Sequence, residues 1–271
     1  MNEFKRSQIV GIVNITTDSF SDGGKCIDAS AAIAHADKLL ADGADILDLG
    51  AAASNPHAEH VSAEEEMRRL EPVVVHLKKI GARISIDTTK IEVQRWAIGE
   101  QVEFLNDIRG FPDERLYLEL AASNAKLIVM HFISDLDKAV RKPKESQEVF
   151  DSIYSFFEMR LQALRAAGVG DDRLIIDPGM GFFLASNPEP SLAVLAHLDD
   201  LKQKFGLPIM IGVSRKSFLK NLAASETVNL GVRSLAAELF AAQTGADYIR
   251  THEPAPLSEG LSTLSAIIEA I

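Results

Sequence analysis

The stretch RISIDTTKIEVQRWAIGEQVEFLND, residues 83–107, decides the fold class. It opens on a short, mostly apolar run that ends at Asp87, and a segment with helical spacing follows at 92–99. A second apolar run then ends at Asn106 and Asp107. Short β-rich runs on either side of a helical segment are typical of two parallel strands joined by a crossover helix. The stretch therefore predicts one strand–helix–strand unit.

The same unit recurs along the whole chain. The strand-like runs are 9–15, 46–49, 83–86, 102–105, 125–130, 174–176, 208–213 and 247–249. The helix-like segments between them are 31–42, 63–80, 92–99, 116–122, 147–167, 190–205 and 230–245. This alternation over 271 residues predicts an α/β fold, a (β/α)8 TIM barrel that forms a single domain over 1–271. The alternative is an open doubly wound sheet, although no Gly-x-Gly-x-x-Gly segment follows the first strand.

Local signals set the expected helix boundaries. Ser62 stands three residues before Glu65, the spacing of a helix start. Glycines are expected to end several helices because they adopt the left-handed conformation without strain. These are Gly43, Gly81, Gly168, Gly206 and Gly245.

Composition restricts the class of partner. The formal net charge is −11, so the overall basic surface of a nucleic-acid-binding protein is absent. No stretch reaches the roughly 20 apolar residues of a membrane span, and the start of the chain lacks the pattern of a signal peptide. Cys26 is the only cysteine, which excludes an internal disulfide and fits a reducing compartment. We expect a cytoplasmic protein that acts on small molecules.

Polar residues follow the predicted strands, where the carboxyl ends of all barrel strands share one mouth. Each of them alone is explained by a helix cap or a turn, but their recurrence predicts a polar pocket. They are Asn14, Asp48, Asp87, Asn106, Asp107, His131, Asp177, Ser214, Arg215, Lys216, Arg250 and His252.

The polar residues divide by hydrogen-bonding character. Asp87, Asn106 and Asp177 offer acceptors, which suit a flat heterocycle that donates several N–H groups. The cationic and imidazole side chains instead suit a phosphate or diphosphate. Asn14 offers a hard oxygen, and Mg²⁺ usually takes few protein ligands together with phosphate oxygens. The small, polar segment 16–24 resembles a mobile lid.

Several motifs together resemble the signatures of dihydropteroate synthases. They follow in family order over essentially the whole chain, which makes a chance match improbable. The motifs are GIVNITTDSFSDGG (11–24), GADILDLG (43–50), SIDT (85–88), NDI (106–108), DPG (177–179), SRKS (214–217) and RTH (250–252).

The resemblance implies an enzyme of folate biosynthesis, usually a homodimer. It joins 6-hydroxymethyl-7,8-dihydropterin diphosphate to p-aminobenzoate and releases diphosphate, with Mg²⁺ as cofactor. It implies that Asp87, Lys216 and Asp177 are catalytic. It assigns four groups of residues: Asp87, Asn106, Asp177, Lys216 and Met130 to the pterin; Asn14, Ser54, Arg250 and His252 to the diphosphate; Asn14 also to the metal; and Ser217, Phe182, Phe183 and Arg215 to p-aminobenzoate.

The chain departs from the family pattern in two loops. Asn55 stands where family members often carry an arginine, which puts a second-loop cation in doubt. Residues 177–184 read DPGMGFFL, where many members read DPGFGFGK. With GFPD at 110–113, this segment resembles the sulfonamide-insensitive synthases. A bulky Phe182 or Phe183 is expected to clash with the drug while sparing the substrate. The alternative is that both phenylalanines are buried packing residues.

Two other functions stay open at this point. A barrel that transfers a methyl group from a reduced pterin to a corrinoid shares the pterin floor, although it needs no SRKS anion motif. A synthase-like pterin-binding protein that has lost activity is the other alternative, motivated by Asn55.

Overall fold

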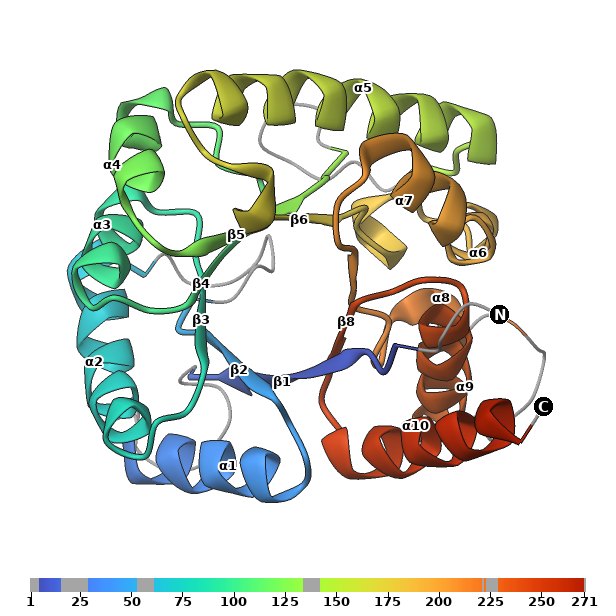
Figure 1. The fold of residues 1–271 in the computed structure, drawn as a ribbon, viewed down its shortest axis with the longest axis horizontal. Coiled ribbons are helices and arrows are strands. Elements are labelled where there is room, and N and C mark those ends of the chain that lie inside the picture. The colour runs from blue at the N-terminus through green and yellow to red at the C-terminus, as the bar shows by residue number, and fades with distance from the viewer. Residues whose placement is uncertain are drawn as a thin grey trace.

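The computed structural model describes residues 5–15, 29–52, 61–133, 142–220, 222 and 229–270. An eight-stranded parallel sheet forms the centre of the molecule (Figure 1). Its strands are β1 (Gln8–Asn14), β2 (Ile46–Gly50), β3 (Ile84–Asp87), β4 (Phe104–Asp107), β5 (Lys126–Met130), β6 (Leu174–Asp177), β7 (Met210–Ile211) and β8 (Tyr248–Thr251). Their order is β6-β5-β4-β3-β2-β1-β8-β7, and a parallel bridge between Ile176 and Ile209 joins the two edges. The expected (β/α)8 barrel is confirmed.

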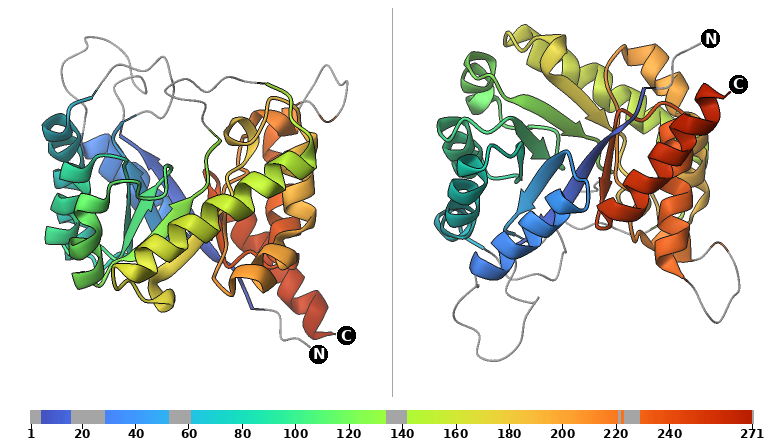
Figure 2. Two further views of the ribbon diagram at one scale, coloured as in Figure 1. Left: turned by 90° about the horizontal axis from the view of Figure 1, so that it is seen from above. Right: turned by 60° about the horizontal axis from the view of Figure 1, so that its bottom comes forward.

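The helices surround this sheet (Figure 2). They are α1 (Ala29–Ala41), α2 (Ala63–Lys79), α3 (Ile91–Gly99), α4 (Tyr117–Ala122), α5 (Ser146–Ala166), α6 (Glu189–Ala196), α7 (Leu198–Phe205), α8 (Ser217–Lys220), α9 (Leu230–Gln243) and α10 (Pro254–Glu269). The start of β1 and the end of α10 lie near the same end of the barrel (Figure 2). The main core fills the layer between strands and helices, with Leu70, Leu105 and Phe157 fully buried.

The predicted helix boundaries are confirmed both at the Ser62 helix start and at the glycines expected to end helices. The side chain of Ser62 accepts a hydrogen bond from the backbone N–H of Glu65 and begins α2. The predicted terminal glycines all have positive φ, between 66° at Gly206 and 109° at Gly245. A side chain at these positions would meet backbone strain, so glycine is the residue that ends each helix there.

Three elements differ from expectation. β7 spans only Met210–Ile211, since Pro208 has no N–H to donate to a ladder. The segment expected as one helix at 190–205 is divided into α6 and α7 at His197, whose φ of −124° and ψ of 30° are not helical. The sequence reading did not predict α10, whose two prolines, at 254 and 256, lie in its first turn. Proline is tolerated there because the first N–H groups of a helix have no partner within it.

The barrel interior is layered. One cluster of apolar side chains comes from seven strands and fills its lower part: Val10, Ile46, Phe104, Ile128, Ile175, Met210 and Tyr248. Side chains two residues further along a strand point the same way. The next inward position on a strand, two residues toward its carboxyl end, is therefore polar on four strands. These residues are Asp48 on β2, Asn106 on β4, Asp177 on β6 and Arg250 on β8, which follow Ile46, Phe104, Ile175 and Tyr248 of the apolar cluster. The sheet thus turns from an apolar floor to a polar upper layer at its carboxyl ends.

The opposite end of the barrel carries its own charged group. Arg83 donates to the carboxylate of Glu103 at 2.8 Å, and its Nη1 donates to Gln8 at 2.8 Å. The Arg83 guanidinium also lies 5.3 Å from the centroid of the Phe104 ring. We assign this end to stability, because barrel chemistry occurs at the carboxyl ends of the strands.

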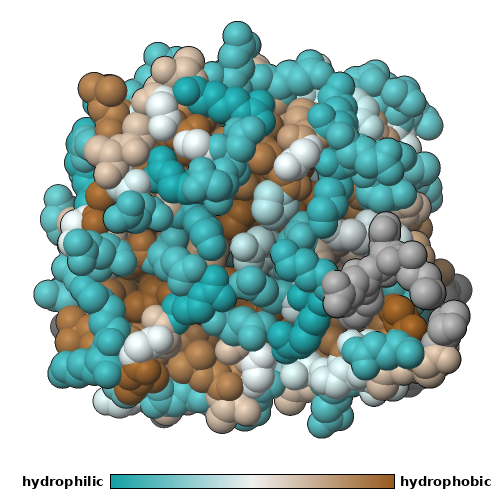
Figure 3. All heavy atoms as spheres, in the orientation of Figure 1, coloured by the Kyte–Doolittle hydropathy of each residue, from teal (hydrophilic) through white to brown (hydrophobic). Residues whose placement is uncertain are grey.

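Hydrophilic side chains, teal in Figure 3, are spread over the face seen in that view, with apolar areas between them.

Candidate active site

A cavity of ≈ 500 Å³ opens at the carboxyl ends of the strands. Polar side chains from β1, β3, β4, β6 and β8 and from the loop after β7 line it, with apolar and small residues between them. The lining residues are Ile12, Asn14, Gly50, Ala52, Asp87, Asn106, Ile108, Met130, Asp177, Met180, Phe183, Gly212, Ser214, Arg215, Lys216, Arg250 and His252. The predicted pocket of mixed charge is therefore present.

Arg250 occupies the centre of a network of carboxylates. Its Nε donates to Oδ2 of Asp48 at 2.6 Å and its Nη2 donates to Oδ2 of Asp87 at 3.0 Å. Asp48 is fully buried and also accepts from Ser85 Oγ at 2.5 Å and from Asn106 Nδ2 at 3.2 Å. Asp48 thus holds two cavity residues, Arg250 and Asn106, in fixed positions.

Asn106 and Asp177 are two hydrogen-bond acceptors that line the cavity. With its Nδ2 bound to Asp48, the buried Asn106 keeps Oδ1 without a hydrogen-bond partner among the described residues. Asp177 accepts from the backbone N–H of Gly179 through Oδ1 at 2.8 Å. A buried acceptor without a partner is costly, so Asn106 Oδ1 suits a ligand that donates an N–H.

The two cavity carboxyls have raised pKa values. Burial and the charge of Asp48 raise the pKa of Asp87 to about 7, although the Arg250 guanidinium opposes the shift. Burial raises the pKa of Asp177 to about 6, against the Gly179 N–H and the Lys216 ammonium. Carboxyls perturbed in this way within one cavity are typical of functional sites.

Lys216 is the ammonium group of the site. Burial and the neighbouring Arg250 lower the pKa of Lys216 to about 8, although Asp177 and Asp87 oppose the shift. Its Nζ lies 4.6 Å from the centroid of the Phe183 ring, a cation–π contact. Phe183 in turn packs edge-on against Phe132, with ring centroids 5.7 Å apart. The Phe183 ring is therefore held from two sides at the cavity wall.

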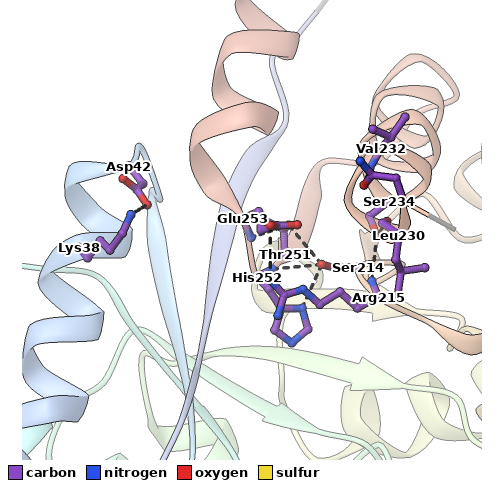
Figure 4. A network of polar contacts seen from close by, with 11 residues as sticks. Lys38, Asp42, Ser214, Arg215, Leu230, Val232, Ser234, Thr251, His252 and Glu253 are labelled. Atoms are coloured by element: carbon purple, nitrogen blue, oxygen red, sulfur yellow. Dashed lines mark hydrogen bonds and ion pairs between the residues drawn. The ribbon is translucent and has the colours of Figure 1, made fainter. Parts of the chain in front are cut away.

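The β8 end of the site is a hydrogen-bonded group of side chains, shown in Figure 4. Ser214 Oγ contacts Nδ1 of His252 at 2.9 Å and accepts from the His252 backbone N–H at 3.2 Å. Arg215, with a positive φ of 57°, donates its backbone N–H to Ser234 and pairs with Glu253 at 3.4 Å. Burial, together with the Arg215, Arg250 and Lys216 cations, lowers the pKa of His252 to about 4. His252 is therefore a neutral imidazole at neutral pH.

Three strand-end residues do not line the cavity, which corrects the expectation that all of them converge there. Asp48 is fully buried and bound to Arg250 and Asn106. Asp107 points away from the interior, where it accepts from Gln94 Nε2 at 2.9 Å and from the Arg109 N–H at 2.7 Å. It is adjacent to Asn106, and neighbouring residues of a strand face opposite sides.

His131 is the third strand-end residue that does not line the cavity. It is buried, with Nδ1 donating to the carbonyl of Pro178 at 3.0 Å and Nε2 3.0 Å from Ser152 Oγ. Burial lowers the pKa of His131 to about 4. It supports the loop after β6 from behind.

Of the four residues predicted to bind p-aminobenzoate, only two line the cavity. Arg215 and Phe183 line the cavity, whereas Ser217, which begins α8, and Phe182, 44% exposed, are not among the described lining residues. Ser54 and Asn55, the lid predicted at 16–24 and Cys26 lie outside the described residues.

Sequence reasoning gave no role to Asp48 or Phe132. Asp48 was predicted only as a strand-end residue. Its register beside Ile12 and Ser85, which directs it inward, is given by the structure and not by the sequence. Within the described ranges no cluster of three or more His, Cys, Asp or Glu side chains is arranged to hold a metal. The helices described here include none that is long and apolar enough to cross a membrane.

Fold and cavity together define the class: a (β/α)8-barrel enzyme that binds a hydrogen-bonding ring beside an anionic group. Residues 10–252 match the model of a family described as pterin binding enzyme. Dihydropteroate synthase type-2 of Escherichia coli is 51% identical to this chain and covers 96% of both sequences. Type-3 of Escherichia coli is 48% identical and covers 96% of this chain and 99% of the relative.

A solved structure agrees with these relatives. Xanthomonas albilineans dihydropteroate synthase with 4-aminobenzoic acid superposes with a TM-score of 0.87 at 34% identity, covering 99% of this chain and 95% of that one. The chain belongs to the dihydropteroate synthase family of pterin-binding enzymes. It is a transferase of folate biosynthesis.

Proposed function

We propose that this chain condenses 6-hydroxymethyl-7,8-dihydropterin diphosphate with p-aminobenzoate to give 7,8-dihydropteroate and diphosphate. The observation that carries the proposal is the joint presence of ring acceptors and anion donors in one cavity of ≈ 500 Å³. The family membership gives the reaction class. The 4-aminobenzoic acid in the Xanthomonas albilineans structure supports the second substrate.

The pterin ring occupies the inner part of the cavity. Asn106 Oδ1 and the carboxylate of Asp177 accept hydrogen bonds from the N–H groups of the pyrimidine edge. Lys216 donates to the ring carbonyl, and Met130 supplies an apolar contact. A ligand that satisfies Asn106 Oδ1 removes the cost of a buried acceptor without a partner.

The diphosphate lies at the β1 and β8 side of the cavity. Arg250 and His252 donate to its oxygens, and Ser54 belongs to the same group by resemblance. The donor set also fits Mg²⁺, because this ion takes few protein ligands and completes its shell with phosphate oxygens and water. Asn14 lines the cavity and would hold it, and a bound Mg²⁺ supplies charge neutralisation for the departing diphosphate.

The reaction begins with the C–O bond to the diphosphate, whose electron pair leaves with the diphosphate. The positive charge left on the methylene carbon is delocalised into the pterin. The carboxylate of Asp87 opposes this charge, and Arg250 favours the ionised form of Asp87. The nitrogen of p-aminobenzoate then forms the new C–N bond and loses a proton. Because the aryl amine attacks in its neutral form, the step needs no strong protein base.

p-Aminobenzoate enters past the outer wall of the cavity. Arg215 pairs there with Glu253 at 3.4 Å and is half exposed, so it is accessible to the substrate carboxylate. Phe183 packs against the aryl ring. Ser217 directly follows Lys216 and lies beside this entrance by resemblance.

We further propose that the chain is insensitive to sulfonamides through Phe183. Contacts with Phe132 and Lys216 fix its ring at the wall where the amine enters. A sulfonamide carries a tetrahedral sulfonyl group and often a large substituent, whereas the substrate carboxylate is small and planar. A ring that cannot move aside therefore discriminates between the two.

A homodimer in the cytoplasm is the proposed state of the protein. Val232, Phe240 and Ile267 are 62%, 45% and 56% exposed on the adjacent helices α9 and α10. Large apolar side chains on neighbouring helices are typical of a protein–protein interface. Phe240→Asp is expected to give monomers in sedimentation, and an unchanged dimer would place the interface elsewhere.

Release of diphosphate tests the proposed reaction. Pterin diphosphate alone is expected to give little release, and addition of p-aminobenzoate is expected to give steady turnover. A pterin methyltransferase or an inactive pterin-binding protein would show no release that depends on p-aminobenzoate.

A further inference from the structure

His131 is a buried imidazole that the proposed reaction does not use. It directly follows β5, is 1% exposed, and its ring lies against Phe156 and Phe157, with centroids 5.3 Å and 6.4 Å away. Its backbone N–H donates to the carbonyl of Asp177 at 2.8 Å. The end of β5 is therefore joined to the end of β6, which carries one of the two acceptors proposed for the pterin.

The two ring nitrogens of His131 have different partners. Nδ1 lies 3.0 Å from the carbonyl oxygen of Pro178, and Nε2 lies 3.0 Å from Oγ of Ser152, which is on α5. A carbonyl oxygen only accepts, so Nδ1 carries the hydrogen. Burial lowers the pKa of His131 to about 4, so the ring is neutral at pH 7 and Nε2 accepts from the Ser152 hydroxyl. The ring is thus a donor toward Pro178 and an acceptor toward Ser152.

The peptide between Pro178 and Gly179 connects this ring to the carboxyl of Asp177. Its carbonyl oxygen accepts from His131 Nδ1, and its N–H donates to Oδ1 of Asp177 at 2.8 Å. The C=O and N–H of a planar trans peptide point in opposite directions. One rigid unit therefore lies between the imidazole and the carboxyl, and the orientation of the first decides what the second meets.

A Pro–Gly peptide of this kind has a second orientation. The φ of 75° at Gly179 is that of the glycine in a type II turn, and a rotation of the central peptide by about 180° gives the type I arrangement. In the rotated state the carbonyl oxygen would face the Asp177 carboxyl and the N–H would face the N–H of His131. Two acceptors and two donors would then oppose each other, and both hydrogen bonds would be lost. His131 therefore disfavours the rotation.

We propose that His131 is a positioning residue for Asp177: its Nδ1–H fixes the Pro178–Gly179 peptide, whose N–H orients the carboxylate and stabilises its ionised form. This inference rests on the proposed function, in which that carboxylate accepts hydrogen bonds from the pterin. Asp177 is thereby prepared for the ring before the ring binds.

The other groups around Asp177 show how much depends on this one N–H. Burial raises the pKa of Asp177 to about 6, and the charge of Asp48 adds to the rise. The Gly179 N–H opposes burial most, ahead of the Lys216 and Arg250 cations. Loss of the Gly179 hydrogen bond is therefore expected to raise the pKa of Asp177 further.

Carbon-13 NMR of aspartate-labelled, ligand-free protein tests the proposal without any substrate. The Asp177 carboxyl is assigned by loss of its signal in Asp177→Asn, and its titration midpoint is then measured. His131→Phe keeps an aromatic ring against Phe156 and Phe157 but removes the donor. Its Asp177 midpoint is expected to lie about one pH unit above that of the wild type, because hydrogen bonds to charged groups are worth at least this much.

Three further variants separate the donor from the packing of the ring. The amide nitrogen of His131→Asn is as many bonds from the backbone as Nδ1, so this variant is expected to restore the wild-type midpoint. The amide of His131→Gln is one bond further out, on the side of Ser152, so it is expected to behave as His131→Phe and replaces it if that variant does not fold. Ser152→Ala is the matched control. It removes the partner of Nε2 and is expected to lower stability to urea while leaving the Asp177 midpoint unchanged.

Calorimetry with 6-hydroxymethyl-7,8-dihydropterin measures the consequence for binding. With the midpoint raised, a smaller fraction of Asp177 is ionised at pH 6, and affinity is expected to be about fivefold weaker in His131→Phe than in the wild type. At pH 8 the carboxyl is ionised in both proteins and the difference is expected to shrink. His131→Asn is expected to follow the wild type at both values.

The proposal would be overturned by an unchanged Asp177 midpoint in folded His131→Phe or His131→Gln. A midpoint raised to the same extent in His131→Asn or Ser152→Ala would also overturn it, because general loosening would then explain the effect. So would wild-type pterin affinity of His131→Phe at pH 6. Failure of the proposed reaction is distinguishable, since diphosphate release would then be absent while the Asp177 titration in the ligand-free variants is as described.

Discussion

Asp48 and Arg250 lie 202 residues apart in the chain, and the Arg250 Nε donates to the buried Asp48 carboxylate at 2.6 Å. The register of the barrel brings them together, because β1 pairs with both β2 and β8. Asp87 binds the other edge of the guanidinium. Arg250 is thereby fixed as a cation at the cavity floor before any substrate arrives, which is the preorganisation that a departing anion requires.

Asp48→Asn tests this anchoring. The variant loses one charge of a buried ion pair while Asp87 still holds Arg250, so we expect unfolding free energy to fall by about 1–3 kcal/mol. The KM for pterin diphosphate is expected to rise about tenfold as Arg250 loses its fixed position. Chemical denaturation and steady-state kinetics measure the two effects. A variant as active and as stable as the wild type would show that Asp48 does not position Arg250.

Asp87→Asn and Lys216→Ala test the catalytic assignment. Each removes a charged group from the cavity, and we expect turnover to fall by roughly 10²–10³ while the fold is retained. Diphosphate release and circular dichroism measure activity and folding. Asp171→Asn is the control, since this carboxylate is exposed and pairs with Arg165 far from the cavity. Normal turnover in a folded Asp87→Asn or Lys216→Ala would remove that residue from the mechanism.

The pterin affinity is expected to depend on pH through Asp177. Burial raises the pKa of Asp177 to about 6, and in the proposed function the ring N–H groups bind the ionised carboxylate. Binding therefore releases a proton below this pKa, and affinity rises with pH. Calorimetry with 6-hydroxymethyl-7,8-dihydropterin is expected to show about tenfold weaker binding at pH 5 than at pH 7. Asp177→Asn is expected to bind weakly at both values, and equal pH dependence in this variant would assign the effect to another group.

Mg²⁺ is expected to be required for turnover, with Asn14 as its protein ligand. The diphosphate needs charge neutralisation to depart, and Asn14 lines the same cavity as Arg250. We expect excess chelator to stop diphosphate release and added Mg²⁺ to restore it. Asn14→Ala is expected to need several times more Mg²⁺ for half-maximal activity. Full activity in the presence of chelator would contradict the metal requirement.

Phe183 and Phe182 form a matched pair for the sulfonamide proposal. Phe183 lines the cavity and is packed against Phe132, whereas Phe182 is 44% exposed. We expect Phe183→Ala to increase sulfonamide inhibition by about tenfold or more, because a steric difference of about 1.4 kcal/mol already gives that factor. The KM for p-aminobenzoate is expected to change less. Inhibition constants for both variants measure this, and equal sensitivity of Phe182→Ala and Phe183→Ala would argue against the steric role of Phe183.

The alternation of strand residues explains how much of the site was predictable from sequence. Asp87, Asn106 and Asp177 end runs that read as parallel strands, and barrel strands present such ends at one mouth. The same reading failed for Asp107 and His131, because the sequence does not give the register that decides which of two neighbouring residues faces inward.

Contacts between side chains of distant segments could not be predicted from the sequence for a related reason. The contact of Asp48 with Arg250 depends on how segments 202 residues apart pack. The break at His197 was likewise not predicted, since the helical spacing of apolar residues continues across it. The late start of β7 has a local cause, because Pro208 has no N–H to donate to the ladder. Local patterns therefore predicted most of the helices and strands, and packing decided which side chains meet.

The central claim is that the pterin lies in this one cavity with Asn106 and Asp177 as its acceptors. A crystal structure with 7,8-dihydropteroate tests it most directly. The account predicts ring N–H groups within hydrogen-bond distance of Asn106 Oδ1 and the Asp177 carboxylate, with the benzoate directed toward Phe183 and Arg215. A ring bound elsewhere, or one that leaves Asn106 Oδ1 without a partner, would contradict the account.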